Sequence, residues 1–133
     1  RVSTLKHAHH TFEIDHEGRD TFRHRAAGAA EVLVSSGTRW ALMSELPGGP
    51  EPALDKLIAK MTAVDLVLIE GWKTSPHPKL EVWRAETGHP LIAPGDETIL
   101  AVATDTSLDM NIPVLDLNDT QALADFVQSE VGI

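Results

Sequence analysis

The sequence predicts an α/β fold whose sheet is mostly parallel and has an antiparallel edge. Apolar runs short enough for buried strands lie at 64–69, 99–103 and 114–117, and each ends in polar residues. Apolar residues at helical spacing cover 53–61 and 119–131. Because strands alternate with helices in the second half of the chain, parallel pairing through crossover connections is favoured.

The first half of the chain is predicted to begin with a strand and to contain a hairpin. Gly28 is a suitable left-handed end for a short helix that Asp20 or Thr21 can cap. Ser36-Gly37 is a turn signal between two apolar segments. The expected elements are a strand over 1–6, a loop over 7–19, a helix from about 20 to 27, and a hairpin of strands 31–35 and 39–46.

The second half is predicted to be organised around the strand that ends at Glu70. A helix leads into residues 64–70, which we expect to be buried on both faces. Residues 79–84 alternate Leu80 and Val82 with charged side chains, which predicts a strand at an edge with one solvated face. Two further strands and a last helix follow, at 99–103, 114–117 and about 119–131.

Length, composition and charge exclude several classes of protein and of site. One domain is expected over the 133 residues, which are enough to bury a core. The sequence has no cysteine, which excludes disulfides, thiolate metal sites and cysteine nucleophiles and suits a reducing cytoplasm, where we expect the protein. A net charge of −9 argues against non-specific nucleic-acid binding, and no apolar run approaches the roughly 20 residues of a membrane span.

Positive charge is concentrated in the first 25 residues, which also hold five of the seven histidines. An anionic ligand is therefore expected against this part of the chain, with Lys6, His9 and His10 as candidate ligands. Four histidines and Asp15 between residues 7 and 16 allow two interpretations. They form either a transition-metal site or a polar loop that faces phosphate, and we favour the loop because no spacing matches a tight zinc site.

Two pairs of cations are further candidates for phosphate contacts. Arg23 and Arg25 lie about 200° apart on a helix, so they cannot both face one phosphate, and we expect one of them to be solvated. Lys73 and Lys79 flank the loop after Glu70, where each is either a phosphate contact or an ordinary surface charge.

Acids at strand ends are the other candidates. At the carboxyl end of a strand in an open α/β sheet, Glu70 can hold Mg²⁺ or orient a water molecule, and Gly71 lets the backbone approach a ligand. The alternative is that Glu70 is simply the first solvated residue after a core strand. Asp105 follows another strand and can accept the paired N–H donors of a guanine, or it caps a loop. The three tryptophans belong either to the core or to an association surface: Trp40, Trp72 and Trp83.

Several separate motifs resemble, in order and spacing, the molybdopterin-guanine dinucleotide biosynthesis protein B (MobB) family. They are Lys6-His7-Ala8-His9-His10, Asp15, Gly18-Arg19-Asp20-Thr21, Arg25-Ala26-Ala27-Gly28-Ala29, Arg39-Trp40-Ala41-Leu42-Met43, Glu70-Gly71-Trp72-Lys73, Pro78-Lys79-Leu80-Glu81-Val82, Ala101-Val102-Ala103-Thr104-Asp105 and Leu115-Asp116-Leu117-Asn118-Asp119.

The resemblance implies a P-loop NTPase-like three-layer domain that binds GTP and Mg²⁺, has weak GTPase activity and forms a homodimer. Such a protein assists the guanylyltransferase that attaches GMP to molybdopterin. By position, Glu70 would be the Walker B-like acid near Mg²⁺, and Asp15 would lie in a mobile loop near the γ-phosphate and the metal. Asp105 would read guanine, with Lys6, His9, His10, Gly71 and Lys73 as further nucleotide-binding candidates.

One family motif does not occur in residues 1–133. The phosphate loop Gly-x-x-x-x-Gly-Lys-Ser/Thr precedes, in the family, the strand with which this chain begins. We therefore expect the N-terminal strand and helix of the domain to be missing, with apolar surface left bare. Three explanations stay open: a fragment, which the initial Arg1 favours, an upstream part that belongs to another product, or a domain that has lost nucleotide binding.

Three functional hypotheses follow. The first is a GTP-binding accessory protein of molybdenum-cofactor synthesis. The second is a non-catalytic adaptor or carrier that dimerises through its strand pair and tryptophans. The third is metal delivery through the histidine cluster, which we rank last.

Overall fold

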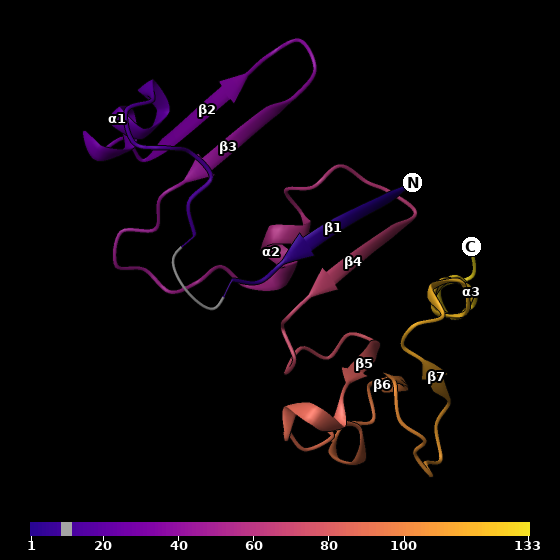
Figure 1. The fold of residues 1–133 in the computed structure, drawn as a ribbon. Coiled ribbons are helices and arrows are strands. Elements are labelled where there is room, and N and C mark those ends of the chain that lie inside the picture. Colours follow the sequence, from indigo (N-terminus) through magenta and orange to yellow (C-terminus); the bar gives the residue numbers. More distant parts are fainter. Residues whose placement is uncertain (9–11) are drawn as a thin grey trace. The chain divides into compact units, whose positions relative to one another are not determined.

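A computed structural model describes residues 1–8 and 12–133, and its elements follow the predicted order. They are β1 (Val2–Lys6), α1 (Asp20–Ala26), β2 (Glu31–Ser35), β3 (Trp40–Ser44), α2 (Leu54–Ile58), β4 (Leu66–Glu70), β5 (Lys79–Trp83), β6 (Ile99–Thr104), β7 (Val114–Asp116) and α3 (Thr120–Val131), with 3₁₀ turns at Ala85–Thr87 and Ala93–Gly95 (Figure 1). The helix expected over 53–61 is shorter than predicted. Among the described residues, no helix is both long and apolar enough to cross a membrane.

The described chain divides into two compact units. One contains Arg1–Ser3, Asp65–Leu68 and Trp72–Ile133, and the other contains Thr4–Val64 and Ile69–Gly71. The expectation of one domain over the 133 residues stays a prediction.

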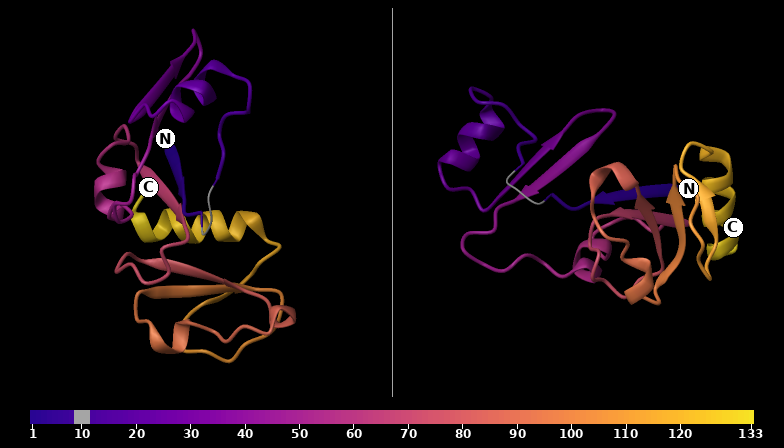
Figure 2. Two further views of the ribbon diagram at one scale, coloured as in Figure 1. Left: turned by 90° about the vertical axis from the view of Figure 1, so that its left-hand side faces the viewer. Right: turned by 60° about the horizontal axis from the view of Figure 1, so that its bottom comes forward.

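The strands pair in three groups, and most of the pairing is parallel, which confirms the predicted fold class. β1 lies beside β4, with the Leu66 N–H donating to the Arg1 carbonyl at one end and the His7 N–H to the Glu70 carbonyl at the other (Figures 1 and 2). β5, β6 and β7 form a parallel sheet in that order. The antiparallel pair is the predicted hairpin of β2 and β3.

Two helix ends follow the capping chemistry of the local sequence, whereas α1 and α2 begin without a capping side chain. α1 ends as predicted before Gly28, which has a φ of +94°, but Arg19 occupies its N-cap in place of Asp20 or Thr21. α3 begins after Asp119, whose carboxylate accepts the Ala122 N–H as an N-cap should.

β4 is less buried than we predicted, and β6 is the most buried of the described strands. Ala101, Val102 and Ala103 in β6 have no exposed surface, but Leu68 in the middle of β4 is 43% exposed. The prediction that β4 is buried on both faces is therefore wrong. β6 is better covered because it is paired on both edges, with β5 and with β7.

β5 lies at the edge of its sheet as predicted, but its side chains are arranged in the opposite way. The charged Glu81 is buried, and the apolar Val82 is 64% exposed. Burial of Glu81 is possible because its two carboxylate oxygens accept the N–H groups of Ile92 and Ala93, each at 2.8 Å. Glu81 thereby orders the segment that connects β5 to β6.

Lys79 at the start of β5 is not an ordinary surface charge, because its side chain is largely buried and paired, and its contact with a phosphate stays a prediction. Its ammonium lies 3.0 Å from Asp96 Oδ2, contacts Thr98 Oγ1 and donates to the Ser75 carbonyl. Hydrogen bonds from the hydroxyl and N–H of Thr98, and then from Lys79, lower the pKa of Asp96 below its usual 3.8.

We predict that Asp96→Asn makes folding stability less dependent on acid pH. Since the folded-state pKa of Asp96 is lowered, its stabilising effect is complete above the unfolded-state pKa of about 4 and disappears as pH falls through the folded-state value. Urea midpoints of wild type and Asp96→Asn should differ most at neutral pH and converge below about pH 4. Asp109→Asn, at an exposed position, is the control, and a difference that stays constant with pH contradicts the prediction.

Candidate functional site

Lys6 and Glu70 meet at the carboxyl ends of the parallel strands β1 and β4. Lys6 is the last residue of β1 and Glu70 the last of β4, and Lys6 Nζ lies 2.5 Å from Glu70 Oε1. Both side chains are exposed. This edge is where open α/β sheets bind ligands, and an exposed carboxylate there can reach a hydrated Mg²⁺. An exposed ion pair by itself adds little stability. The position of Glu70 is therefore compatible with a role at Mg²⁺ and equally with a solvated residue that simply follows a core strand.

His7 packs against Gly71 directly beyond this pair. The His7 N–H donates to the Glu70 carbonyl, and His7 Nε2 lies 3.0 Å from Glu51 Oε1. Gly71 has a φ of +94°, and a Cβ built on it would lie 2.6 Å from the Cβ of His7. The close approach that we predicted at Gly71 is therefore made by His7, and an approach by a ligand stays a prediction.

The turn after β4 is strained. Trp72 follows Gly71 with a φ of +47°, which is unusual for a bulky residue. Left-handed conformations at non-glycine residues are concentrated at functional sites. Lys73 is exposed just beyond this turn, and its predicted phosphate contact remains to be tested.

The histidine cluster is only partly described. His9 and His10 lie outside the described residues, so their roles stay predictions. Within residues 1–8 and 12–133, no group of three or more His, Cys, Asp or Glu side chains is arranged to hold a metal ion. A metal site at the histidine cluster therefore stays a hypothesis.

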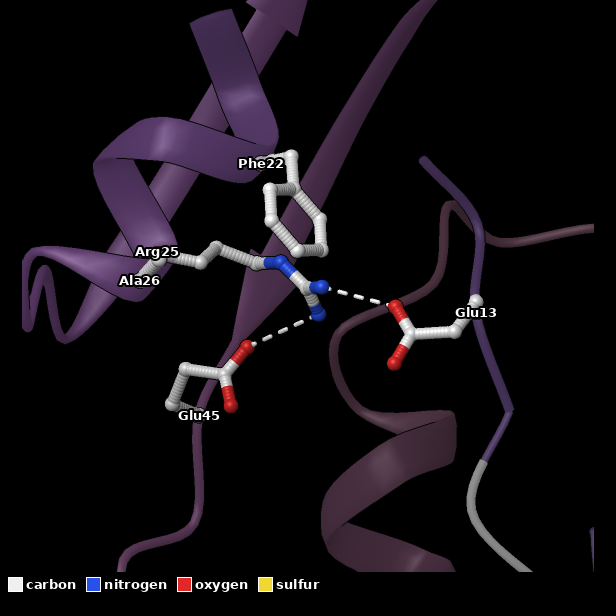
Figure 3. Close-up of a pocket in the computed structure, with 5 residues that line it drawn as sticks. All are labelled: Glu13, Phe22, Arg25, Ala26 and Glu45. Carbon is white, nitrogen blue, oxygen red and sulfur yellow. Dashed lines mark hydrogen bonds and ion pairs between the residues drawn. The ribbon is translucent and has the colours of Figure 1, made fainter. Parts of the chain in front are cut away.

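Arg25 gathers three carboxylates around its guanidinium. Nη2 lies 2.7 Å from Glu13 Oε2 and 3.0 Å from Asp15 Oδ1, and Nη1 lies 3.2 Å from Glu45 Oε1. Figure 3 shows the guanidinium between Glu13 and Glu45, with the Phe22 ring beside it. The Cζ atom of Arg25 lies 5.8 Å from the centroid of this ring. The hydrogen bond to Glu13 and the nearby carboxylates raise the pKa of Arg25, which keeps it charged.

This cluster changes the interpretation of Asp15. The resemblance implied a mobile loop near a phosphate and a metal, but the Asp15 side chain is only 8% exposed and is paired with Arg25. To reach a metal ion, the carboxylate must first leave this guanidinium. Of the two arginines on α1, Arg25 is the one whose side chain is largely buried, while Arg23 is exposed, as expected for side chains about 200° apart on a helix.

A second site lies at the carboxyl ends of β6 and β7. It is a pocket lined by Thr104, Asp105, Thr106, Ser107, Val114, Leu115, Asp116 and Asn118. Asp105 Oδ2 lies 2.8 Å from Arg84 Nη1, and the Thr106 hydroxyl donates to Asp105 Oδ1. The N–H and side-chain amide of Asn118 both donate to Asp116 Oδ1.

This pocket combines oriented polar groups with two apolar side chains, Val114 and Leu115. A planar ligand with N–H donors suits such a lining, because the carboxylate of Asp105 is an oriented acceptor. From the sequence we predicted Asp105 as a site residue, but not Arg84, Asp116 or Asn118. Their position at or directly after predicted parallel strands was the signal that could have identified them.

Comparison with protein families and relatives gives a consistent result. The family model described as molybdopterin guanine dinucleotide synthesis protein B matches residues 1–105. A Haemophilus influenzae protein named molybdopterin-guanine dinucleotide biosynthesis adapter protein is 40% identical over 131 residues, which are 97% of this chain and 72% of the relative. The Escherichia coli K12 protein of the same name is 40% identical over 130 residues, 96% of this chain and 74% of its own length.

Solved structures share the fold. A crystal structure of molybdopterin-guanine biosynthesis protein B superimposes with a TM-score of 0.73 at 22% identity, covering 98% of this chain and 80% of that one. A MobB homologue from Bacillus stearothermophilus gives a TM-score of 0.68 at 26% identity, covering 98% of this chain and 77% of that one.

We predict that Gly71→Ala destabilises the protein by at least about 2 kcal/mol, because the new Cβ collides with His7 in a left-handed backbone. Gly37→Ala is the matched control, since its Cβ would meet nothing within 4 Å. The combination of Gly71→Ala with His7→Gly should cost less than the sum of the two changes in urea unfolding. Additive losses would contradict the contact as the cause.

Proposed function

The chain belongs to the molybdopterin-guanine dinucleotide synthesis protein B family, and from this we propose that it is a cytoplasmic adapter of molybdopterin-guanine dinucleotide synthesis that binds GTP with Mg²⁺. It hydrolyses GTP weakly and assists the guanylyltransferase that joins GMP to molybdopterin. The names of the two relatives support the pathway.

The observation that carries the nucleotide proposal is the pocket around Asp105. It opens at the carboxyl ends of parallel strands and contains an acid whose orientation is held by Arg84. A guanine base presents N1–H and its 2-amino group on one edge, and a carboxylate accepts both. Adenine presents an acceptor at N1, which a carboxylate repels. GTP is therefore preferred over ATP.

The Lys6 and Glu70 pair supplies the candidate phosphate and metal groups. Glu70 is the acid that helps to hold Mg²⁺, and Lys6 turns from Glu70 to a phosphate oxygen when nucleotide binds. Lys73, His9, His10 and the backbone at Gly71 are candidates for further phosphate contacts. Asp15 would be available to the metal and the γ-phosphate only if its carboxylate separated from Arg25.

A second candidate function is an adaptor without hydrolysis, and the outer face of the β2–β3 hairpin favours it. Leu33 lies opposite Leu42, and Trp40 lies on the same face, where all three side chains are exposed. On the other face, Val32 and Met43 are buried. We propose that the exposed face, called here the hairpin face, joins two copies in a homodimer.

The nucleotide proposal predicts a change of base preference in Asp105→Asn. An amide offers one acceptor and one donor, which match the N1–H and the 2-carbonyl of xanthine better than guanine. Calorimetric titration with Mg²⁺ should give GTP binding tighter than ATP binding in the wild type. In Asp105→Asn, GTP should bind about tenfold or more weakly and XTP more tightly.

Asp109→Asn is the control in this experiment and should leave the order of nucleotides unchanged. If the wild type does not bind GTP more tightly than ATP, guanine recognition is rejected and the adaptor function without hydrolysis is favoured.

The dimer proposal predicts that Trp40→Glu produces monomers. Trp40 is 67% exposed, and a charge there would be buried without a partner in the proposed contact. Sedimentation at micromolar concentration should show a dimer for wild type and a monomer for Trp40→Glu. Val82→Glu changes an equally exposed residue on β5 and should leave the dimer intact. A wild-type monomer in this experiment would rule out the hairpin face as a stable dimer contact.

A further inference from the structure

We infer that Arg84 is a positioning residue for base recognition: it orients the carboxylate of Asp105 and thereby sets the preference for guanine. The inference rests on the proposed GTP binding and adds a residue to that site. Arg84 does not need to touch the base, because its effect is exerted through Asp105.

Strand pairing places the two residues side by side. Trp83, the last residue of β5, is paired with Thr104, the last residue of β6, so Arg84 and Asp105 are the next residues of adjacent parallel strands. Their side chains meet at 2.8 Å between Nη1 and Oδ2.

Arg84 is held at its own backbone. Its carbonyl accepts the hydroxyl of Thr87 at 2.8 Å and the Thr87 N–H at 3.2 Å, within the short turn Ala85–Thr87. The guanidinium therefore extends from a fixed point towards Asp105. On the opposite side, the Thr106 hydroxyl contacts Asp105 Oδ1.

The pair leaves Asp105 able to bind a base. Each carboxylate oxygen has two lone pairs, so Oδ2 can accept from Arg84 and still accept a second N–H, while Oδ1 accepts another. Without Arg84 the half-buried carboxylate could rotate, and the two acceptors would have to be ordered again each time a base binds.

Charge provides an independent argument. Asp105 and Asp116 both line the pocket, and two like charges in one pocket repel each other, which disfavours a fixed orientation of the Asp105 carboxylate unless a cation holds it. After Arg84 the sequence contains no lysine or arginine, so the C-terminal segment cannot replace its charge. Lys79, on the same strand, is bonded to Asp96. Arg84 is thus the arginine that offsets the acids of this pocket.

The test is the ratio of GTP to ATP affinity in Arg84→Gln. We expect GTP to bind roughly five- to tenfold more weakly, with ATP changed by less than about twofold, because ATP does not use the carboxylate. Arg84→Lys should recover part of the preference, since it restores a charge but not the planar fork. Arg23→Gln, an exposed arginine on α1, should change neither affinity.

A double-mutant cycle separates positioning from a general effect on folding. In an Asp105→Asn background, Arg84→Gln should have little further effect on GTP. Equal loss of GTP and ATP affinity, or unchanged GTP affinity, in Arg84→Gln would overturn the inference.

The proposed function is judged separately from Arg84. If wild type prefers GTP and Asp105→Asn removes the preference while Arg84→Gln does not, guanine recognition stands and the role of Arg84 is rejected. If wild type does not discriminate between GTP and ATP, both are rejected.

Discussion

Parallel pairing is the constraint on which both candidate sites depend. Parallel strands end at the same edge of a sheet, so residues far apart in sequence become neighbours there. The pairing of β1 with β4 brings Lys6 beside Glu70, and the pairing of β5, β6 and β7 brings Arg84 beside Asp105 and the Asp116–Asn118 turn. In the sheet of β5, β6 and β7, the middle of β6 is completely buried. Because a fully packed strand leaves its last residues little freedom to move, this burial fixes the position of the residues at its carboxyl end.

The acidic chain uses many of its cations to neutralise its own carboxylates. Arg25 is surrounded by three acids, Lys79 is bonded to Asp96, and Arg84 to Asp105. A cluster of cationic residues in the sequence therefore contains fewer cations available to an anionic ligand than their number suggests. In the basic N-terminal segment, Lys6 differs from Arg25 because its own side chain is exposed, as is that of its partner Glu70, so that the pair can separate at low cost.

The nucleotide and adaptor functions are compatible in one molecule. The candidate base pocket around Asp105 lies at the end of a parallel sheet, and the hairpin face lies on an antiparallel pair whose other side contains the buried Val32 and Met43. Since these surfaces use different residues, substitutions in one can be compared with substitutions in the other. An adapter that requires GTP would lose function after substitutions in either surface. An adapter that does not use a nucleotide would lose function only after substitutions in the hairpin face.

Local patterns in the sequence determined the order of the elements, the hairpin, the end of α1 before Gly28 and the choice between Arg23 and Arg25, since each depends on residues close in the chain. The family resemblance likewise rests on ordered motifs. Tertiary structure alone decided that β6 is the buried strand, that Glu81 points inward, that Asp15 is held by Arg25 and that His7 fills the space beside Gly71. The physical reason is that periodicity specifies which residues share a face, while burial of a charge depends on a partner brought from a distant part of the chain.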